Sequence, residues 1–118
     1  MNPLQAWHEI RDACRRRPEL RHKNYDEYGI GVNPIPNLNP MLGFCYVATE
    51  VFCHLVPEAR PYKHKELDHI FAKIGDEVWD LTMDQYDFVP DYENSYRRNR
   101  RPLTKRGQLL LEEVRRVI

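Results

Sequence analysis

The chain has 118 residues, of which 42% are hydrophobic and 31% are charged, a composition typical of a folded domain rather than of a disordered chain. Its 18 basic and 18 acidic side chains give a formal net charge of zero, which excludes a general electrostatic attraction for nucleic acid or an anionic membrane. No apolar run approaches the roughly 20 residues that span a bilayer, and the N-terminus lacks the pattern of a secretion signal. We therefore expect one domain over residues 1–118, located in the cytoplasm.

The first predicted element is a helix over residues 3–17. Asn2 can cap it, and proline suits the first helical position, which Pro3 occupies. Helical spacing places six residues on one face, and that face predicts a core role for Cys14: Leu4, Ala6, Trp7, Ile10, Ala13 and Cys14. A proline-rich stretch over residues 17–40 then predicts a long loop, and long loops in compact domains are often functional.

Residues 45–55 have a wide apolar stripe at helical intervals, which predicts a buried helix. Residues 69–74 and 77–82 read as two strands joined by a tight turn at Gly75-Asp76, because glycine suits the first central position of such a turn. A further helix is expected from about Thr104 to the C-terminus.

The turn fixes which residues share a face of the predicted hairpin. It makes His69 and Asp80 diagonal neighbours, within reach of an imidazole and a carboxylate. A shift of one residue would separate them and expose the apolar set of the other face, so the hydrophobic pattern itself favours this register. Asp80 would then orient His69 as a general base.

Cys45 is expected in the first turn of the buried helix. Unpaired N–H groups and the helix dipole favour a thiolate there, and the same groups can hold a developing oxyanion. Gly43 permits close approach of a substrate, and either Asn39 or Asn37 could add a side-chain donor. The predicted site therefore has Cys45 as nucleophile with His69 and Asp80, and an oxyanion or substrate-binding side at Asn39, Gly43 and Phe44.

The segments GFCYVATEVF and DHIFAKIGDEVWDLTMDQYD resemble the YunG-like proteins, small bacterial proteins with a Gly-x-Cys helix, a later histidine strand and an Asp-Leu-Thr-x-x-Gln segment. The resemblance covers residues 39–88 well and extends more distantly to the papain-like and transglutaminase-like superfamily. It implies a small papain-like α+β domain in which a central helix carrying Cys45 packs against a short antiparallel sheet. It also implies acyl transfer on an amide or thioester by Cys45, His69 and Asp80. The chain departs from the papain pattern, because His69 follows Cys45 by only 24 residues, so we expect a minimal substrate cleft.

Several other readings remain open. His64 and Asp68 flank His69, but their spacing matches no familiar zinc site, so we expect no metal and no cofactor. Thr82 and Gln85 have capping-box spacing, which favours a structural role for Gln85.

A protein or peptide-like substrate fits the enzyme hypothesis. The alternative is a catalytically silent module of the same fold that sequesters a protein partner. The basic cluster is most simply a solvated surface, and nucleic-acid binding through it is the least favoured reading: Arg97, Arg98, Arg100 and Arg101.

Overall fold

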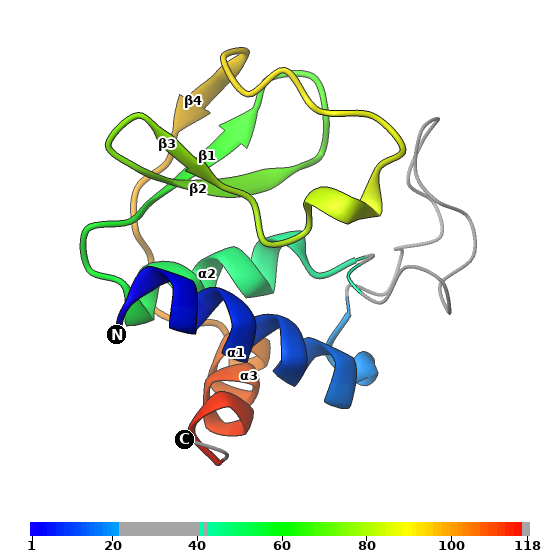
Figure 1. The fold of residues 1–118 in the computed structure, drawn as a ribbon, viewed down its shortest axis with the longest axis vertical. Helices are drawn as coiled ribbons and strands as arrows, with labels where there is room; N and C mark the ends of the chain where they lie inside the picture. Colours follow the sequence, from blue (N-terminus) through cyan, green and yellow to red (C-terminus); the bar gives the residue numbers. More distant parts are fainter. Residues whose placement is uncertain (22–40, 42, 117–118) are drawn as a thin grey trace.

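The computed structural model describes residues 1–21, 41 and 43–116 of the chain. The fold is α+β, as expected, with helices at both the N-terminal and C-terminal ends of the described chain. Figure 1 shows the sheet on one side of the molecule and the three α-helices on the other, with α2 next to the sheet. The elements in chain order are α1 (Pro3–Arg16), η1 (Pro18–Leu20), α2 (Cys45–Leu55), β1 (Arg60–His64), β2 (Ile70–Ile74), β3 (Glu77–Trp79), η3 (Met83–Gln85), β4 (Ser95–Arg97) and α3 (Lys105–Arg116).

The four strands form one antiparallel sheet in the order β3-β2-β1-β4. The expected hairpin is confirmed, because Ile74 pairs with Glu77 and Ala72 pairs with Trp79. Gly75 has φ +60°, a conformation that costs a glycine little and any other residue more. Both strands are shorter than expected, so the hairpin ladder ends at Trp79 and Asp80 lies just beyond it.

Helix α1 begins where the sequence predicts. The Asn2 side chain accepts hydrogen bonds from the N–H groups of Leu4 and Gln5 at 2.9 and 3.3 Å. The expected buried face is wrong at Leu4, which is 57% exposed. At about 100° per residue, Leu4 lies well over a quarter-turn from the centre of the face that is buried. That face consists of Ala6, Ile10, Ala13 and Cys14.

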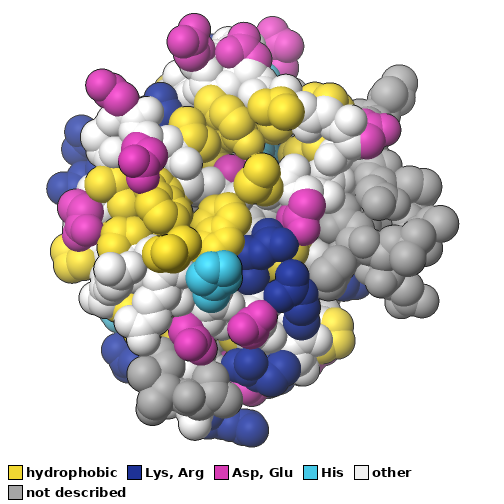
Figure 2. All heavy atoms as spheres, viewed as in Figure 1, with side chains coloured by type: hydrophobic (Ala, Val, Ile, Leu, Met, Phe, Trp, Pro, Cys, Tyr) yellow, Lys and Arg dark blue, Asp and Glu magenta, His cyan; other side chains and the backbone are white. Residues whose placement is uncertain are grey.

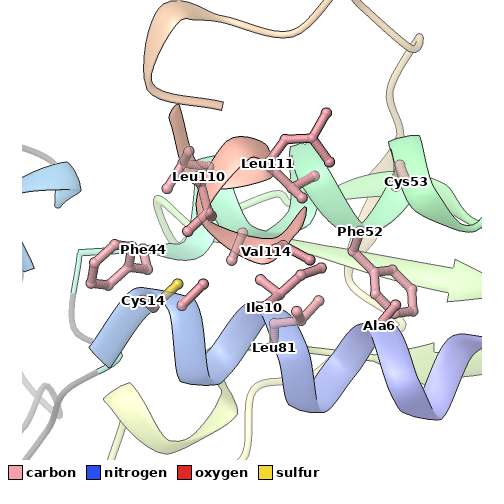
Figure 3. Packing of buried hydrophobic residues seen from close by; sticks show 14 of the residues in the cluster. Ala6, Ile10, Cys14, Phe44, Phe52, Cys53, Leu81, Leu110, Leu111 and Val114 are labelled. Atoms are coloured by element: carbon pink, nitrogen blue, oxygen red, sulfur yellow. The ribbon is translucent and has the colours of Figure 1, made fainter. Parts of the chain in front are cut away.

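The three α-helices share one hydrophobic core beneath the sheet. Figure 3 shows Ile10 of α1, Phe52 of α2 and Val114 of α3 meeting in it. Leu81, which follows β3, lies in the same cluster and links the helices to the end of the hairpin. Cys14 is fully buried there, which confirms its predicted core role. This packing fixes α2 against both the other helices and β2, and so fixes the position of its first turn.

The surface matches the balanced composition. Figure 2 shows basic and acidic side chains interspersed over the face that carries α1, with hydrophobic side chains gathered toward its upper half. No helix among the described residues is long and apolar enough to cross a membrane. Most of the expected long loop, residues 22–40, lies outside the described residues, and η1 occupies its beginning.

Candidate active site

Cys45 is the first residue of α2, at the end of the helix where we expected it. Gly43, with φ +86°, bends the chain immediately before the helix, and only glycine adopts this conformation at low cost. The N-cap residue is Phe44, whose side chain has no polar group with which to cap the helix. The positive end of the helix dipole and the first-turn N–H groups of α2 therefore lie beside the Cys45 thiol.

His69 lies immediately before β2, and Asp80 immediately after β3. Because these two ends of the hairpin are adjacent, His69 Nε2 and Asp80 Oδ2 are 2.7 Å apart. His69 has no exposed surface and Asp80 is 3% exposed. A hydrogen bond between an imidazole and a carboxylate strengthens in such surroundings, where water does not compete for either partner.

Two further donors hold Asp80 in place. The Tyr92 hydroxyl donates to Asp80 Oδ2 at 2.8 Å, and the Thr82 N–H donates to Asp80 Oδ1 at 3.2 Å. The carboxylate thus accepts three hydrogen bonds from three separate segments of the chain. Burial raises the pKa of Tyr92, and the charge of Asp80 raises it further, so Tyr92 stays a hydrogen-bond donor at neutral pH.

Cys45 lies close enough to His69 to affect the pKa of the imidazole. Burial lowers the pKa of His69, but the hydrogen bond to Asp80 and the further interactions with Asp80 and Cys45 outweigh burial and raise the pKa to about 9. A raised pKa favours the protonated, positively charged form of the ring. Cys45 therefore lies beside the buried His69–Asp80 pair.

Gln85 is a site residue that the sequence analysis assigned to a capping box. The structure corrects that interpretation, because Thr82 makes no side-chain cap to η3 and the Gln85 side chain points into the site. Its Nε2 lies 3.3 Å from His69 Nδ1, and its buried Oε1 has no hydrogen-bond partner among the described residues. The Thr-x-x-Gln spacing fits both a capping box and a Gln85 side chain in the site, so the spacing alone does not identify Gln85 as a site residue. The sequence signal for the second role is the Asp-Leu-Thr-x-x-Gln segment on which the resemblance rests.

Aromatic rings surround His69 on its other sides. Phe71 stacks at 6.2 Å between ring centroids, and Tyr86 meets the imidazole edge-on at 5.0 Å. The Phe71 ring in turn packs against Tyr92. These rings exclude water from the His69–Asp80 pair and hold the imidazole in one orientation.

The predicted oxyanion and substrate-binding residues have different outcomes. Asn39 lies outside the described residues, as does Asn37. Gly43 is buried beside the start of α2, where its backbone fits the expected role. The Phe44 side chain has no exposed surface and packs in the core, so only its main chain can face a substrate.

The other two cysteines lie in different surroundings. Burial raises the pKa of Cys14, and burial also raises the pKa of Cys53 to about 11. Cys53 is 6% exposed, whereas Cys14 and Cys45 have no exposed surface. Neither Cys14 nor Cys53 is in a setting that favours a thiolate at neutral pH, so Cys45 is the one candidate nucleophile among the three cysteines.

His64 and Asp68 do not form a metal site with Cys45. His64 Nδ1 accepts hydrogen bonds from the N–H groups of Glu66 and Leu67, both at 3.0 Å, and so stabilises the turn between β1 and β2. Asp68 accepts a hydrogen bond from the Tyr46 hydroxyl. Within residues 1–21, 41 and 43–116, no three His, Cys, Asp or Glu side chains are grouped so that they could hold a metal ion.

No protein-family model, no curated protein and no solved structure matches the chain.

Proposed function

We propose that the protein is a cysteine-dependent acyl-transfer enzyme acting on an amide or thioester, in the manner of a hydrolase, deamidase or transglutaminase. The observation that carries this proposal is the buried His69–Asp80 pair, with 2.7 Å between the carboxylate and the imidazole, beside Cys45 at the start of α2. A nucleophile, a proton carrier and an orienting carboxylate in this order are what acyl transfer requires. The resemblance to YunG-like proteins, and through them to papain-like enzymes, supports the same chemistry.

In the first step the Cys45 sulfur attacks the carbonyl carbon, a C–S bond forms, and the carbonyl electron pair moves to oxygen. The N–H groups of the first turn of α2 stabilise that oxyanion. His69 then gives its proton to the leaving nitrogen or sulfur as the bond to carbon breaks, which leaves an acyl-enzyme. Asp80 holds the ring in place and stabilises its positive charge throughout.

In the second step water or an amine attacks the acyl group. His69 accepts the proton of the attacking group, the C–S bond breaks, and the thiolate–imidazolium pair is restored. Water as the attacking group gives hydrolysis, and an amine gives transfer. Gln85, whose amide nitrogen lies 3.3 Å from His69 Nδ1, is a positioning residue that holds the imidazole ring in place.

The alternative is a catalytically silent module of the same fold that sequesters a protein partner. The specific observation in its favour is that Cys45 and His69 have no exposed surface. A substrate reaches the sulfur only if the site opens, and a silent module has no need to open it. Reactivity of Cys45 in the native protein therefore separates the two proposals.

Alkylation of the native protein by iodoacetamide at pH 6–7, followed by mass spectrometry of the labelled cysteines, provides the test. Exposure alone predicts that Cys53 reacts first, since it is the most exposed of the three. The enzyme proposal predicts that Cys45 reacts first, because only its surroundings favour a thiolate at this pH. His69→Ala should slow the labelling of Cys45 by at least about tenfold, since the thiolate loses its imidazolium partner.

His54→Ala is the matched control, because His54 is exposed in the last turn of α2, at the opposite end of the helix from Cys45. It should leave the labelling of Cys45 unchanged. Labelling of Cys53 ahead of Cys45, or equal rates in wild type and His69→Ala, would contradict the enzyme proposal and leave the silent module in its place.

A further inference from the structure

A second candidate site lies on another side of α2. An open cavity of about 490 Å³ lies between α2 and the segment that leads from β4 into α3, and Figure 1 shows this segment running past α2 in orange. Cys45, His69 and Asp80 do not line the cavity, although Tyr46 and Asp68, their neighbours in the sequence, do. Its volume is in the range of sites that bind small molecules.

The cavity has an excess of positive charge. Four arginines line it: Arg98, Arg100, Arg101 and Arg106. Within the described part of the chain, none of them lies within ion-pair distance of a carboxylate. Arg98 lies over the Tyr46 ring at 5.9 Å, and Arg100 donates only to main-chain carbonyls such as that of Cys53. Their charges are therefore not neutralised by neighbouring side chains, and a positive concave surface concentrates anions.

Two carboxylates also line the cavity, and both have other partners. Glu50 accepts hydrogen bonds from the N–H and the hydroxyl of Thr104, at the start of α3, where the helix dipole stabilises its charge. Asp68 accepts a hydrogen bond from the Tyr46 hydroxyl at 2.6 Å. Two engaged carboxylates against four arginines leave the lining with a positive surplus.

The remaining lining is partly apolar and partly polar, the polar part including Thr49, His54 and Asn99. The apolar part includes Val47 and Cys53 of α2, Ile70 of β2, and Pro102 and Leu103 of the segment before α3. An inorganic anion has no apolar surface to bury against these residues. A ligand with a hydrocarbon part binds more tightly, because it buries that part against them. Guanidinium groups are the side chains best suited to carboxylate, sulfonate and phosphate groups. The lining therefore combines recognition of an anionic group with recognition of an apolar body.

We propose that this cavity binds a small organic anion, made of an aromatic or aliphatic body that carries one carboxylate, sulfonate or phosphate group. The body lies against Val47 and Leu103, and the anionic group lies among the arginines. This site does not depend on the acyl-transfer chemistry proposed for Cys45.

Fluorescence titration with 1-anilinonaphthalene-8-sulfonate tests the proposal, because this probe joins an apolar ring system to a single anionic group. The native protein should bind it saturably, with one probe per chain. Arg98→Gln and Arg101→Gln should each raise the Kd by about tenfold, the loss expected for one charge-assisted contact. Arg101 is exposed, so its replacement leaves the fold intact.

Arg115→Gln is the matched control, because Arg115 is exposed on α3 and does not line the cavity. It should leave the Kd unchanged, and so should Cys45→Ala, which separates this site from the catalytic proposal. Equal weakening in Arg115→Gln and Arg101→Gln, or no saturable binding by the native protein, would overturn the proposal.

Competition against the bound probe tests separately whether the anionic group and the apolar body of a ligand each contribute to binding. Phenyl phosphate and benzoate should displace the probe at lower concentrations than either inorganic phosphate or neutral benzyl alcohol. If inorganic phosphate competes as well as phenyl phosphate, the apolar wall has no role and the proposal is wrong. If benzyl alcohol competes as well as benzoate, the arginines have no role and the proposal is equally wrong.

Discussion

Replacement of Asp80 by asparagine is the sharpest perturbation of the candidate site. The two side chains have nearly the same shape, so Asp80→Asn removes the negative charge while leaving an oxygen in reach of His69. The neighbouring groups remain, including the Tyr92 hydroxyl and the Thr82 N–H. The change thus isolates what the charge of Asp80 does to His69.

The magnitude follows from the pKa of His69, which is about 9 against an ordinary value of 6.5. At about 1.4 kcal/mol per pKa unit, the surroundings favour the protonated ring by about 3 kcal/mol. Burial opposes that preference, and the hydrogen bond to Asp80 is foremost among the interactions that create it. Without the carboxylate, burial prevails, and the pKa of His69 should fall by about two units or more.

The sign of the pH dependence follows from the same values. A histidine whose pKa is raised by folding stabilises the native state below pH 6.5, and that stabilisation is lost as the pH rises through 9. The free energy of unfolding of the wild type should therefore fall by up to about 3 kcal/mol between pH 6.5 and 9. In Asp80→Asn most of this dependence should disappear.

NMR titration of the His69 ring protons between pH 5 and 10 measures the pKa directly, and urea unfolding across the same range measures the stability. Asp84→Asn is the matched control, because Asp84 pairs with Arg11 at the surface and not with His69. A pKa for His69 that is the same in Asp80→Asn and in the wild type would refute the reasoning.

Two further predictions concern the helices that hold the site. Ile10→Ala should reduce the free energy of unfolding by about 2–5 kcal/mol in urea, because Ile10 is fully buried, whereas Leu4→Ala should change it by less than about 0.5 kcal/mol, because Leu4 is 57% exposed. Equal costs would contradict the observed buried face of α1. Gly107→Ala should cost less than about 1 kcal/mol in the same assay, since its Cβ would lie 2.5 Å from the Glu50 carboxylate and displace that flexible cap of α3, while alanine favours the helix over glycine. The double variant with Glu50→Ala should recover part of that cost, and no recovery would exclude the clash as its cause.

The sequence was most informative where a signal and its effect lie a few residues apart. Asn2 and Pro3 determine the start of α1, and Gly75 determines the turn of the hairpin. From that turn alone the register follows, and with it the meeting of His69 and Asp80. The start of α2 at Cys45 is equally local, because the chain before it has little helical character.

Strands β1 and β4 were not predicted. Strand β1 contains Pro61, and a proline without an N–H is uncommon in a strand that pairs on both sides, yet β1 lies between β2 and β4 and pairs with both. Strand β4 has three residues, which is too few to give an alternating pattern. Both strands form only by pairing with segments distant in the sequence. The hydrophobic periodicity of a segment does not indicate such pairing.

The sequence alone determined that α2 starts at Cys45 and that His69 meets Asp80, because the helix start and the turn each depend on a few neighbouring residues. The tertiary structure alone decided that Tyr92 donates to Asp80 and that the Gln85 side chain turns to His69 rather than to its own helix. It alone also placed four arginines around an apolar cavity. These contacts join segments whose separation along the chain bears no relation to their distance in space, so they arise only when the sheet and the three helices pack together.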